Sequence, residues 1–309
     1  MNILITGATG FIGSYLIDTL LNDSNYNIII LKRSTSNTFR IDKLLSRVEV
    51  YDIDTIELDE VFKNNKINGI IHLATHYVKE HKTKDINNLI ESNITFPTKL
   101  VELSVEYGVE YFINTGTFFE YSFNSNPVTE KSDITPYNLY AATKLAFNNM
   151  LAYYGNNTNL NIVTLKLAAP FGYNDNQKLV PYLIKTVLND EEIILEKGEQ
   201  EWDFIYVKDV VSAYIKTIDL CQNSKRSIFE EILIGTSNKT SIKKIVNVIN
   251  KLHGKDMISL EKDYQPNQIF TAYLDNSKAK NMLQWLPQYS IEDALKETYN
   301  LYKEKKNEK

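Results

Sequence analysis

The chain opens with Met1-Asn-Ile-Leu-Ile-Thr-Gly7-Ala-Thr-Gly10-Phe-Ile-Gly13, the segment with the strongest structural signal in the sequence. Residues 2–6 are mostly apolar and β-branched, which is typical of a strand buried on both faces of a parallel sheet. A helical pattern over residues 14–21 begins directly after the third glycine. A strand that turns through glycines into a helix predicts the first unit of an alternating α/β fold.

The three glycines have different tasks in such a turn. Gly7 permits the tight bend, Gly10 lets the backbone approach a pyrophosphate, and Gly13 lets the helix pack close to the strand. The helix N-terminus offers free N–H groups and a partial positive charge to phosphates. We therefore expect a bound dinucleotide here, although the spacing is G-x-x-G-x-x-G and three glycines also occur in ordinary strand–helix turns.

Strand signals alternate with helix signals along the first half of the chain. The expected strands after the first are residues 26–31, 48–53, 69–75, 111–117 and 161–168. This alternation predicts an α/β fold, a Rossmann-type doubly wound parallel sheet with ligands at the carboxyl ends of its strands. We expect a dinucleotide-binding domain over 1–168, to which later segments return, and a smaller α/β substrate-binding lobe formed mainly by 169–309.

The composition limits the class of protein. With 43% hydrophobic and 24% charged residues, the 309-residue chain resembles ordinary soluble proteins, and its net charge of −5 argues against nucleic acid as a partner. No apolar run approaches the ~20 residues of a membrane span, and no basic leader precedes the first strand. We expect a cytoplasmic protein, which the single cysteine, Cys221, also fits. The four histidines match no zinc spacing, so no metal is expected.

The end of the second strand is the place where such folds choose their cofactor. It reads Lys32-Arg33-Ser34 and contains no acid, whereas an acidic residue would bind the ribose 2′-hydroxyl of NAD. Arg33 and Ser34, joined by Lys32, could instead hold the 2′-phosphate of NADP. The alternative is a solvated basic turn. Asp52 and Ile53, at the end of the third strand, are expected beside the adenine.

Two further helices contain candidate site residues. Helical signals run over 86–107, where Pro97 predicts a kink or break and Asn93 lies just before it. In the helix expected over 140–154, Tyr140 and Lys144 lie four residues apart and share one face. The pair alone proves nothing in a chain rich in both residue types.

Taken together, these motifs resemble the extended short-chain dehydrogenase/reductase family over nearly the whole chain. The glycine turn, His72-Leu-Ala74, Asn93 and Tyr140-x-x-x-Lys144 match its motifs in order. Two C-terminal segments are similar to its nucleotide-sugar branch, and the first of them, together with Ile70-Ile-His-Leu-Ala-Thr75, is similar to 4-ketoreductases acting on CDP-linked sugars. They are Gly198-Glu-Gln-x-x-Asp203-Phe-Ile-Tyr-Val-x-Asp209 and Leu274-Asp275-x-Ser-Lys-Ala.

The resemblance implies an NAD(P)-dependent oxidoreductase with Thr117, Tyr140 and Lys144 as its catalytic residues. Tyr140 would give a proton to a ketone oxygen, Thr117 would bind the same oxygen, and the charge of Lys144 would lower the pKa of Tyr140. The expected cofactor-binding residues are Gly7, Thr9, Gly10, Phe11, Ile12, Gly13, Arg33, Ser34, Asp52, Ile53, Leu73, Ala74, Thr75, Asn93, Tyr140 and Lys144. The expected substrate-binding residues are Thr117, Phe118, Phe119, Lys178 and Trp202.

The chain departs from that branch at positions that usually hold the substrate. Trp202 and Gln265 stand where the branch has arginines for the diphosphate, and Ala169 replaces an expected asparagine. Lys178 and Lys185 are candidate substitutes for the missing positive charge. The usual mode of nucleotide-sugar binding therefore does not carry over directly.

Three functions compete on these residues. The first is NADPH-dependent reduction of a CDP- or dTDP-linked 4-keto-6-deoxyhexose, a step toward bacterial surface polysaccharides. The second is a nucleotide-sugar 4-epimerase that retains NAD, and the third is a non-catalytic NADP-binding regulator. A 4,6-dehydratase is disfavoured because Phe118-Phe119 stand where an Asp-Glu pair would follow Thr117.

The resemblance also implies a homodimer in which helices near 95–107 and 140–154 form a four-helix bundle with their symmetry mates. These helices hold more apolar positions than covering a sheet would need. The positions are Leu100, Val101, Leu145, Phe147 and Leu151.

Overall fold

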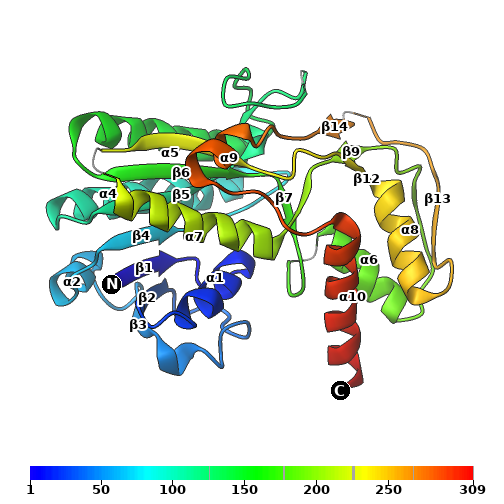
Figure 1. Cartoon of the computed structure of the whole chain (residues 1–309), viewed down its shortest axis with the longest axis horizontal. Helices are drawn as coiled ribbons and strands as arrows, with labels where there is room; N and C mark the ends of the chain where they lie inside the picture. The colour runs from blue at the N-terminus through cyan, green and yellow to red at the C-terminus, as the bar shows by residue number, and fades with distance from the viewer. Residues whose placement is uncertain (125, 177, 225–226, 267, 309) are drawn as a thin grey trace.

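The computed structural model describes residues 1–124, 126–176, 178–224, 227–266 and 268–308. Within these ranges a seven-stranded parallel sheet forms the centre of the molecule, in the order β11-β6-β5-β4-β1-β2-β3 (Figure 1). Its strands are β1 (Asn2–Thr6), β2 (Asn27–Lys32), β3 (Glu49–Asp52), β4 (Gly69–His72), β5 (Tyr111–Thr117), β6 (Asn161–Leu167) and β11 (Phe229–Ile234). The predicted Rossmann-type doubly wound sheet is confirmed.

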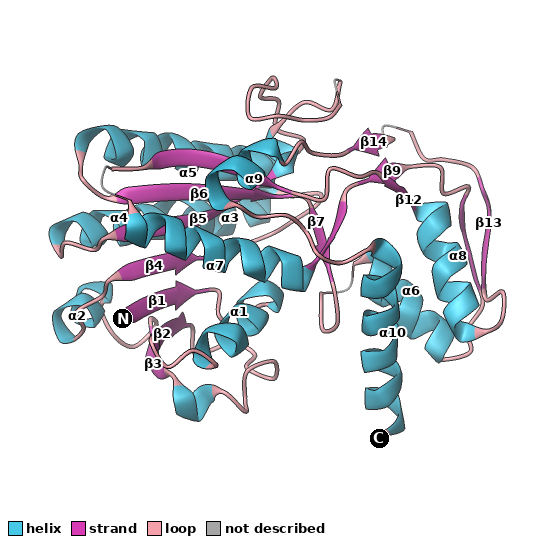
Figure 2. Ribbon diagram, viewed as in Figure 1, coloured by secondary structure: helices cyan, strands magenta, loops and turns pink. Residues whose placement is uncertain are grey.

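Helices cover both faces of this sheet because its strands are apolar on both sides. Ile3 and Ile5 of β1 pack into one core and Leu4 into another, as the alternation of side chains along a strand requires. The first face is covered by α1 (Phe11–Leu21), α7 (Val207–Asn223) and α9 (Ser277–Leu283) (Figure 2). The second face is covered by α2 (Leu58–Asn64), α4 (Phe96–Glu106) and α5 (Leu139–Asn157).

The core on the α4–α5 face corrects one expectation. Leu100, Val101, Phe147 and Leu151 are fully buried inside the single chain, and only Leu145 of the predicted set is half-buried. They are core residues because α4 and α5 pack on the sheet and also on one another. The inference that these positions exceed what the sheet needs was wrong, and they give no support for a dimer.

The helical segment before β5 is irregular at a different place from the one predicted. It runs from α3 (Ile86–Ile90) through a π-helical turn (Glu91–Thr95) into α4 without a break. Pro97 is the second residue of α4, so its missing backbone N–H falls at the junction of the π turn with the α-helix. Of the kink or break expected at Pro97, the break is not found; the observed irregularity is the π turn around Asn93, which ends two residues before the proline.

A second group of helices lies at the right of Figure 1 and shares its own core. It consists of α6 (Leu179–Leu188), α8 (Ile242–His253) and α10 (Ile291–Asn307). The short strands are β7 (Ala169–Phe171), β8 (Ile193–Glu196), β9 (Glu201–Trp202), β10 (Phe204–Tyr206), β12 (Thr240–Ser241), β13 (Ile258–Lys262) and β14 (Thr271–Ala272). Among the described residues, no helix is long and apolar enough to cross a membrane.

Candidate active site

The glycine turn between β1 and α1 has no room for side chains at two of its glycines. Gly7 has a φ of +70°, and a Cβ there would lie 2.6 Å from the backbone nitrogen of Ala74. A Cβ on Gly13 would lie 2.4 Å from the carbonyl oxygen of Gly7. Gly10 is the N-cap of α1 and supplies no side-chain cap, so the first-turn N–H groups keep their capacity for an anion.

Two of the neighbouring residues expected at the cofactor differ in exposure. Phe11 is 5% exposed and belongs to the α6–α8–α10 core, whereas Thr9 is half-buried at the turn. Lys178, which was expected at the substrate, lies near this turn, since its ammonium is 5.9 Å from the centre of the Phe11 ring. The same ammonium forms an ion pair with Asp175 at 3.4 Å. Lys185 contacts the ring of Tyr302 on α10 instead.

Asn93 holds the loop that follows β4. Its Oδ1 accepts hydrogen bonds from the Thr75 hydroxyl at 2.9 Å and the His76 backbone N–H at 2.8 Å. Its Nδ2 donates to the His76 carbonyl at 3.0 Å and to the Thr143 hydroxyl of α5 at 2.9 Å. These four bonds use all the capacity of the amide. Asn93 therefore fixes the loop at Ala74 and Thr75 against α5.

The basic turn after β2 meets acids from the neighbouring strand. Lys32 forms an ion pair with Asp52 at 3.0 Å, and the Ser34 hydroxyl donates to the same carboxylate at 2.9 Å. The Ser34 N–H donates to Asp54 at 2.8 Å. The turn itself contains no acid, but these acids reach it from the end of the next strand, because β2 and β3 are adjacent parallel strands that end at the same edge. Arg33 is exposed and has no side-chain ion pair within the described ranges.

The two residues predicted on one face of α5 are both influenced by Glu120, which lies in the turn that follows β5. Helix α5 begins after Asn138, whose side chain accepts from the Ala141 N–H at 2.9 Å, and it packs against β5 and the 3₁₀ turn Phe118–Glu120. Lys144 is 3% exposed. Thr117, the last residue of β5, is 7% exposed and its hydroxyl caps the 3₁₀ turn. A side-chain hydrogen bond joins Tyr140 to Thr75 on the other side.

The electrostatics of this pair differ from the expectation. Burial raises the pKa of Tyr140 above its usual value of 10, and the carboxylate of Glu120 raises it further. Burial lowers the pKa of Lys144 to about 8, against an opposing effect of Glu120. The expected lowering of the Tyr140 pKa by Lys144 is not found: desolvation of the phenolate is the largest effect, and it raises the pKa.

Aromatic side chains form a wall beside Thr117. The Phe119 ring stacks on Tyr137 at 5.6 Å between centres, and it meets Trp202 edge-on at 5.9 Å. The Trp202 indole N–H donates to the Ile269 carbonyl at 3.0 Å. Phe118 is only 1% exposed and lies in the core beneath Phe119. Of the two phenylalanines, Phe119 is therefore the one with surface to offer a substrate.

Two residues near Tyr140 were not among the site residues expected from the sequence. Tyr77 is 52% exposed, and its ring meets that of Tyr140 edge-to-face at 4.9 Å between centres. Glu120 is 1% exposed and forms an ion pair with Lys166 of β6 at 3.1 Å. A lysine within the apolar strand Val163-Thr-Leu-Lys-Leu167 was the available signal, because a buried ammonium requires a buried anion.

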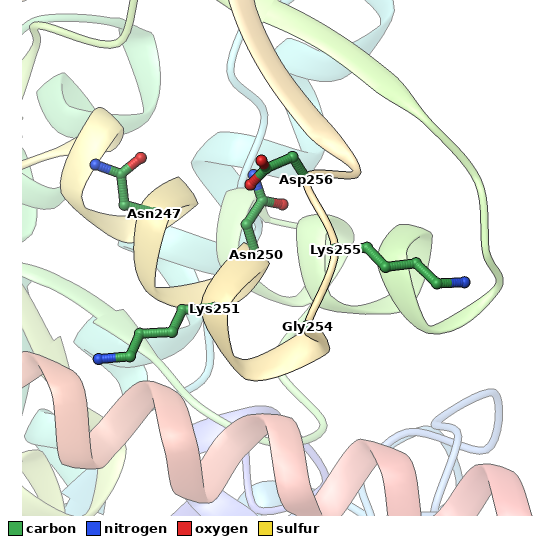
Figure 3. A pocket seen from close by; sticks show the side chains of 6 residues that line it. All are labelled: Asn247, Asn250, Lys251, Gly254, Lys255 and Asp256. Atoms are coloured by element: carbon green, nitrogen blue, oxygen red, sulfur yellow. The ribbon is translucent and has the colours of Figure 1, made fainter.

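A hollow elsewhere has no comparable chemistry. It lies at the end of α8, away from α5, and is lined by Asn247, Asn250, Lys251, Gly254, Lys255 and Asp256 (Figure 3). The two lysine side chains point away from one another (Figure 3). No group of three or more His, Cys, Asp or Glu residues within the described ranges could hold a metal ion.

Comparison with known proteins places this geometry in a family. Residues 3–235 match the NAD dependent epimerase/dehydratase family. CDP-abequose synthase of Salmonella muenchen is 28% identical over 302 residues, with 97% of each chain covered. UDP-glucose 4-epimerase of Caenorhabditis elegans is 27% identical over 344 residues, also with 97% of each covered.

A solved structure gives the same result for the fold. UDP-glucuronic acid 4-epimerase from Bacillus cereus, in complex with UDP-glucuronic acid and NAD, superposes with a TM-score of 0.87. It is 28% identical, and the match covers 98% of this chain and 99% of that one. The chain therefore belongs to the NAD-dependent epimerase/dehydratase family and is an NAD(P)-dependent enzyme of the extended short-chain dehydrogenase/reductase type.

Proposed function

We propose that this enzyme reduces a 4-keto-6-deoxyhexose carried on CDP or dTDP, with NADPH as the hydride donor. The observation that carries the proposal is that Glu120, which accepts the Thr117 N–H, also acts electrostatically on both Tyr140 and Lys144, beside a wall of aromatic rings. The similarity to CDP-abequose synthase over nearly the full length of both chains supports a reductase acting on a CDP-sugar.

The residues present fit a dinucleotide. Side chains at Gly7 or Gly13 would clash with backbone, and the uncapped N-terminus of α1 offers N–H groups to a pyrophosphate. The loop at Ala74 and Thr75, fixed by Asn93, would lie along the cofactor. When bound, the reduced nicotinamide supplies the hydride.

The protein's part is to place a proton at the ketone oxygen. The raised pKa keeps the Tyr140 hydroxyl protonated at neutral pH, which is the form that a proton donor requires. The Thr117 hydroxyl would donate to the same oxygen and fix its position. The Lys144 ammonium would stabilise the phenolate that remains after proton transfer.

The aromatic wall favours a reductase over an epimerase. An epimerase must turn its keto sugar between two half-reactions, which needs a roomy pocket. Phe119, stacked on Tyr137 and flanked by Trp202, occupies space next to Thr117 and would favour one binding pose.

A UDP-sugar 4-epimerase that retains NAD is the second candidate. Its support comes from the similarity to 4-epimerases and from Asp52 and Asp54, whose carboxylates reach the turn where a 2′-phosphate would bind. The uncommitted guanidinium of Arg33 is the feature that favours NADP.

The test is to mix the purified enzyme with NADPH and each of the CDP-, dTDP- and GDP-linked 4-keto-6-deoxyhexoses. Oxidation of NADPH with at least one of them, followed by absorbance, is the expected result. The same protein is incubated with UDP-glucose and UDP-glucuronic acid without added cofactor. Interconversion of those sugars together with no NADPH oxidation would reject the reductase and establish the epimerase.

A further inference from the structure

A buried pair of opposite charges lies directly beneath Thr117. Lys166 is 0% exposed, Glu120 is 1% exposed, and the distance from the Lys166 ammonium to the Glu120 carboxylate is 3.1 Å. The same ammonium forms an ion pair with Glu231 of β11 at 2.6 Å and donates to the Tyr121 hydroxyl at 3.1 Å. Such pairs seldom stabilise a fold, because taking both charges out of water costs as much as their attraction returns.

The pair is bonded to the backbone of the proposed catalytic threonine. The Thr117 N–H donates to Oε1 of Glu120 at 3.0 Å, and the Thr117 hydroxyl accepts from the Phe119 N–H at 3.3 Å. Gly116 makes this arrangement possible, because a Cβ there would lie 2.8 Å from the Lys166 side chain. The orientation of Thr117 therefore depends on the Glu120 carboxylate.

The other charged and titratable groups around the pair lie at three places in the fold. Glu231 lies on β11, Tyr121 follows the 3₁₀ turn, and Tyr140 and Lys144 lie on α5. Glu120 interacts with two cations, Lys166 and Lys144. Burial lowers the pKa of Lys144, and the negative charge of Glu120 opposes that fall.

The remaining group near Lys144 is neutral. His72 of β4 is fully buried, and burial together with the charge of Lys144 holds its pKa well below 6.5. Glu120 is thus the anion that acts on Lys144 among the described residues.

We propose that Glu120, anchored by Lys166, is a positioning residue of the catalytic site that orients Thr117 and acts electrostatically on Lys144. This inference rests on the proposed function in so far as Thr117, Tyr140 and Lys144 are the catalytic set. Its test does not need a substrate, so the two can fail separately.

The test is an NMR titration of Lys144 in protein labelled with ¹³C-lysine, with the signal assigned by its loss in Lys144→Met. In the unchanged protein the midpoint should lie at about 8. Glu120→Gln keeps an oxygen that can accept the Thr117 N–H but removes the charge, so the midpoint should fall by about one pH unit. Glu231→Gln is the matched control: it removes the other carboxylate on Lys166, which has no bond to Thr117, and should leave the midpoint unchanged.

A double variant guards against misfolding. Glu120→Gln combined with Lys166→Met removes both fully buried charges, leaves Glu231 with a side chain 30% exposed to water, and should show the same fall in the Lys144 midpoint. A midpoint equal to that of the unchanged protein in both Glu120 variants would overturn the proposal. An equal fall in Glu231→Gln would also overturn it, because the effect would then be a general loss of negative charge.

Discussion

The Tyr140 hydroxyl is surrounded by groups that act on it in opposite directions. Burial and the Glu120 carboxylate disfavour the phenolate, whereas the hydrogen bond with Thr75 favours it. Thr75 is itself held by Asn93, which also bonds to Thr143 one turn along α5. The position of the hydroxyl thus depends on a chain of bonds from the loop after β4 back to its own helix.

We expect Tyr140→Phe to abolish turnover while leaving cofactor affinity nearly unchanged, since it removes only the hydroxyl that gives the proton. Loss of turnover should be at least ~10²-fold, the usual contribution of general acid catalysis. Steady-state kinetics and cofactor titration by fluorescence measure the two quantities. Tyr77→Phe, which keeps the ring facing Tyr140, is the control and should retain activity.

The rate of reduction should fall as the pH rises through about 8. Burial lowers the pKa of Lys144 to about 8, so above that pH the ammonium loses its proton and no longer stabilises the phenolate. The profile of kcat against pH measures this limb. A profile that stays flat up to pH 10 would contradict the role of Lys144.

Arg33→Asp should change the cofactor preference from NADPH to NADH, because it removes the uncommitted positive charge at the basic turn and adds a negative one. The ratio of kcat/KM for the two cofactors is the measurement. Lys280→Asp, an equal change of charge at an exposed site on α9, should leave that ratio as it is. Equal use of both cofactors by the unchanged protein would show that Arg33 is merely solvated.

At the scale of elements, the glycine turn can be tested with a matched pair of glycines. Gly7 and Gly108 have φ values of +70° and +67°, but a Cβ at Gly108 would meet nothing within 4 Å. Gly108→Ala should therefore cost about 1–2 kcal/mol in the free energy of unfolding, from backbone strain alone. Gly7→Ala should cost at least ~2 kcal/mol more, since its Cβ clashes with Ala74. Denaturant unfolding of both variants decides this.

The elements with strong local signals were predictable from sequence. The strand–glycine–helix opening and the apolar strands are encoded by residues close together in the chain, so their pattern can be read directly. The sequence predicted a kink or break at Pro97 but not the π turn around Asn93 that precedes it, because a π turn leaves no local signature while a proline does. The acids facing the basic turn were missed, since their approach depends on the pairing of β2 with β3.

The candidate site was predictable only in part, for a related reason. Tyr140 and Lys144 lie on one helix, so their common face follows from spacing. Glu120, Lys166 and Glu231 come from a turn and two strands, and only the assembled sheet brings them together. Phe118 and Phe119 are adjacent in sequence, yet one is buried and the other lies in the aromatic wall, which depends on the local 3₁₀ turn.

At the scale of the whole molecule, a homodimer remains a prediction. Its interface would have to use exposed residues of α4 and α5, because the apolar residues expected there are mostly buried inside the single chain. Val105 of α4 and Met150 and Tyr153 of α5 are 36%, 42% and 64% exposed. We expect light scattering to give the mass of a dimer, and Tyr153→Glu to give a monomer. Tyr182→Glu, at a tyrosine 48% exposed on α6, is the control and should remain dimeric.

The sheet is completed by a strand that comes late in the sequence. β11 (Phe229–Ile234) pairs with β6 (Asn161–Leu167), and the whole segment containing α6 and α7 lies between them in the chain. During synthesis, one edge of β6 therefore stays unpaired until the ribosome has made and released the intervening segment and β11. A nascent chain stalled just before Phe229 should be sensitive to protease and prone to aggregate, and it should become resistant once Ile234 has left the exit tunnel.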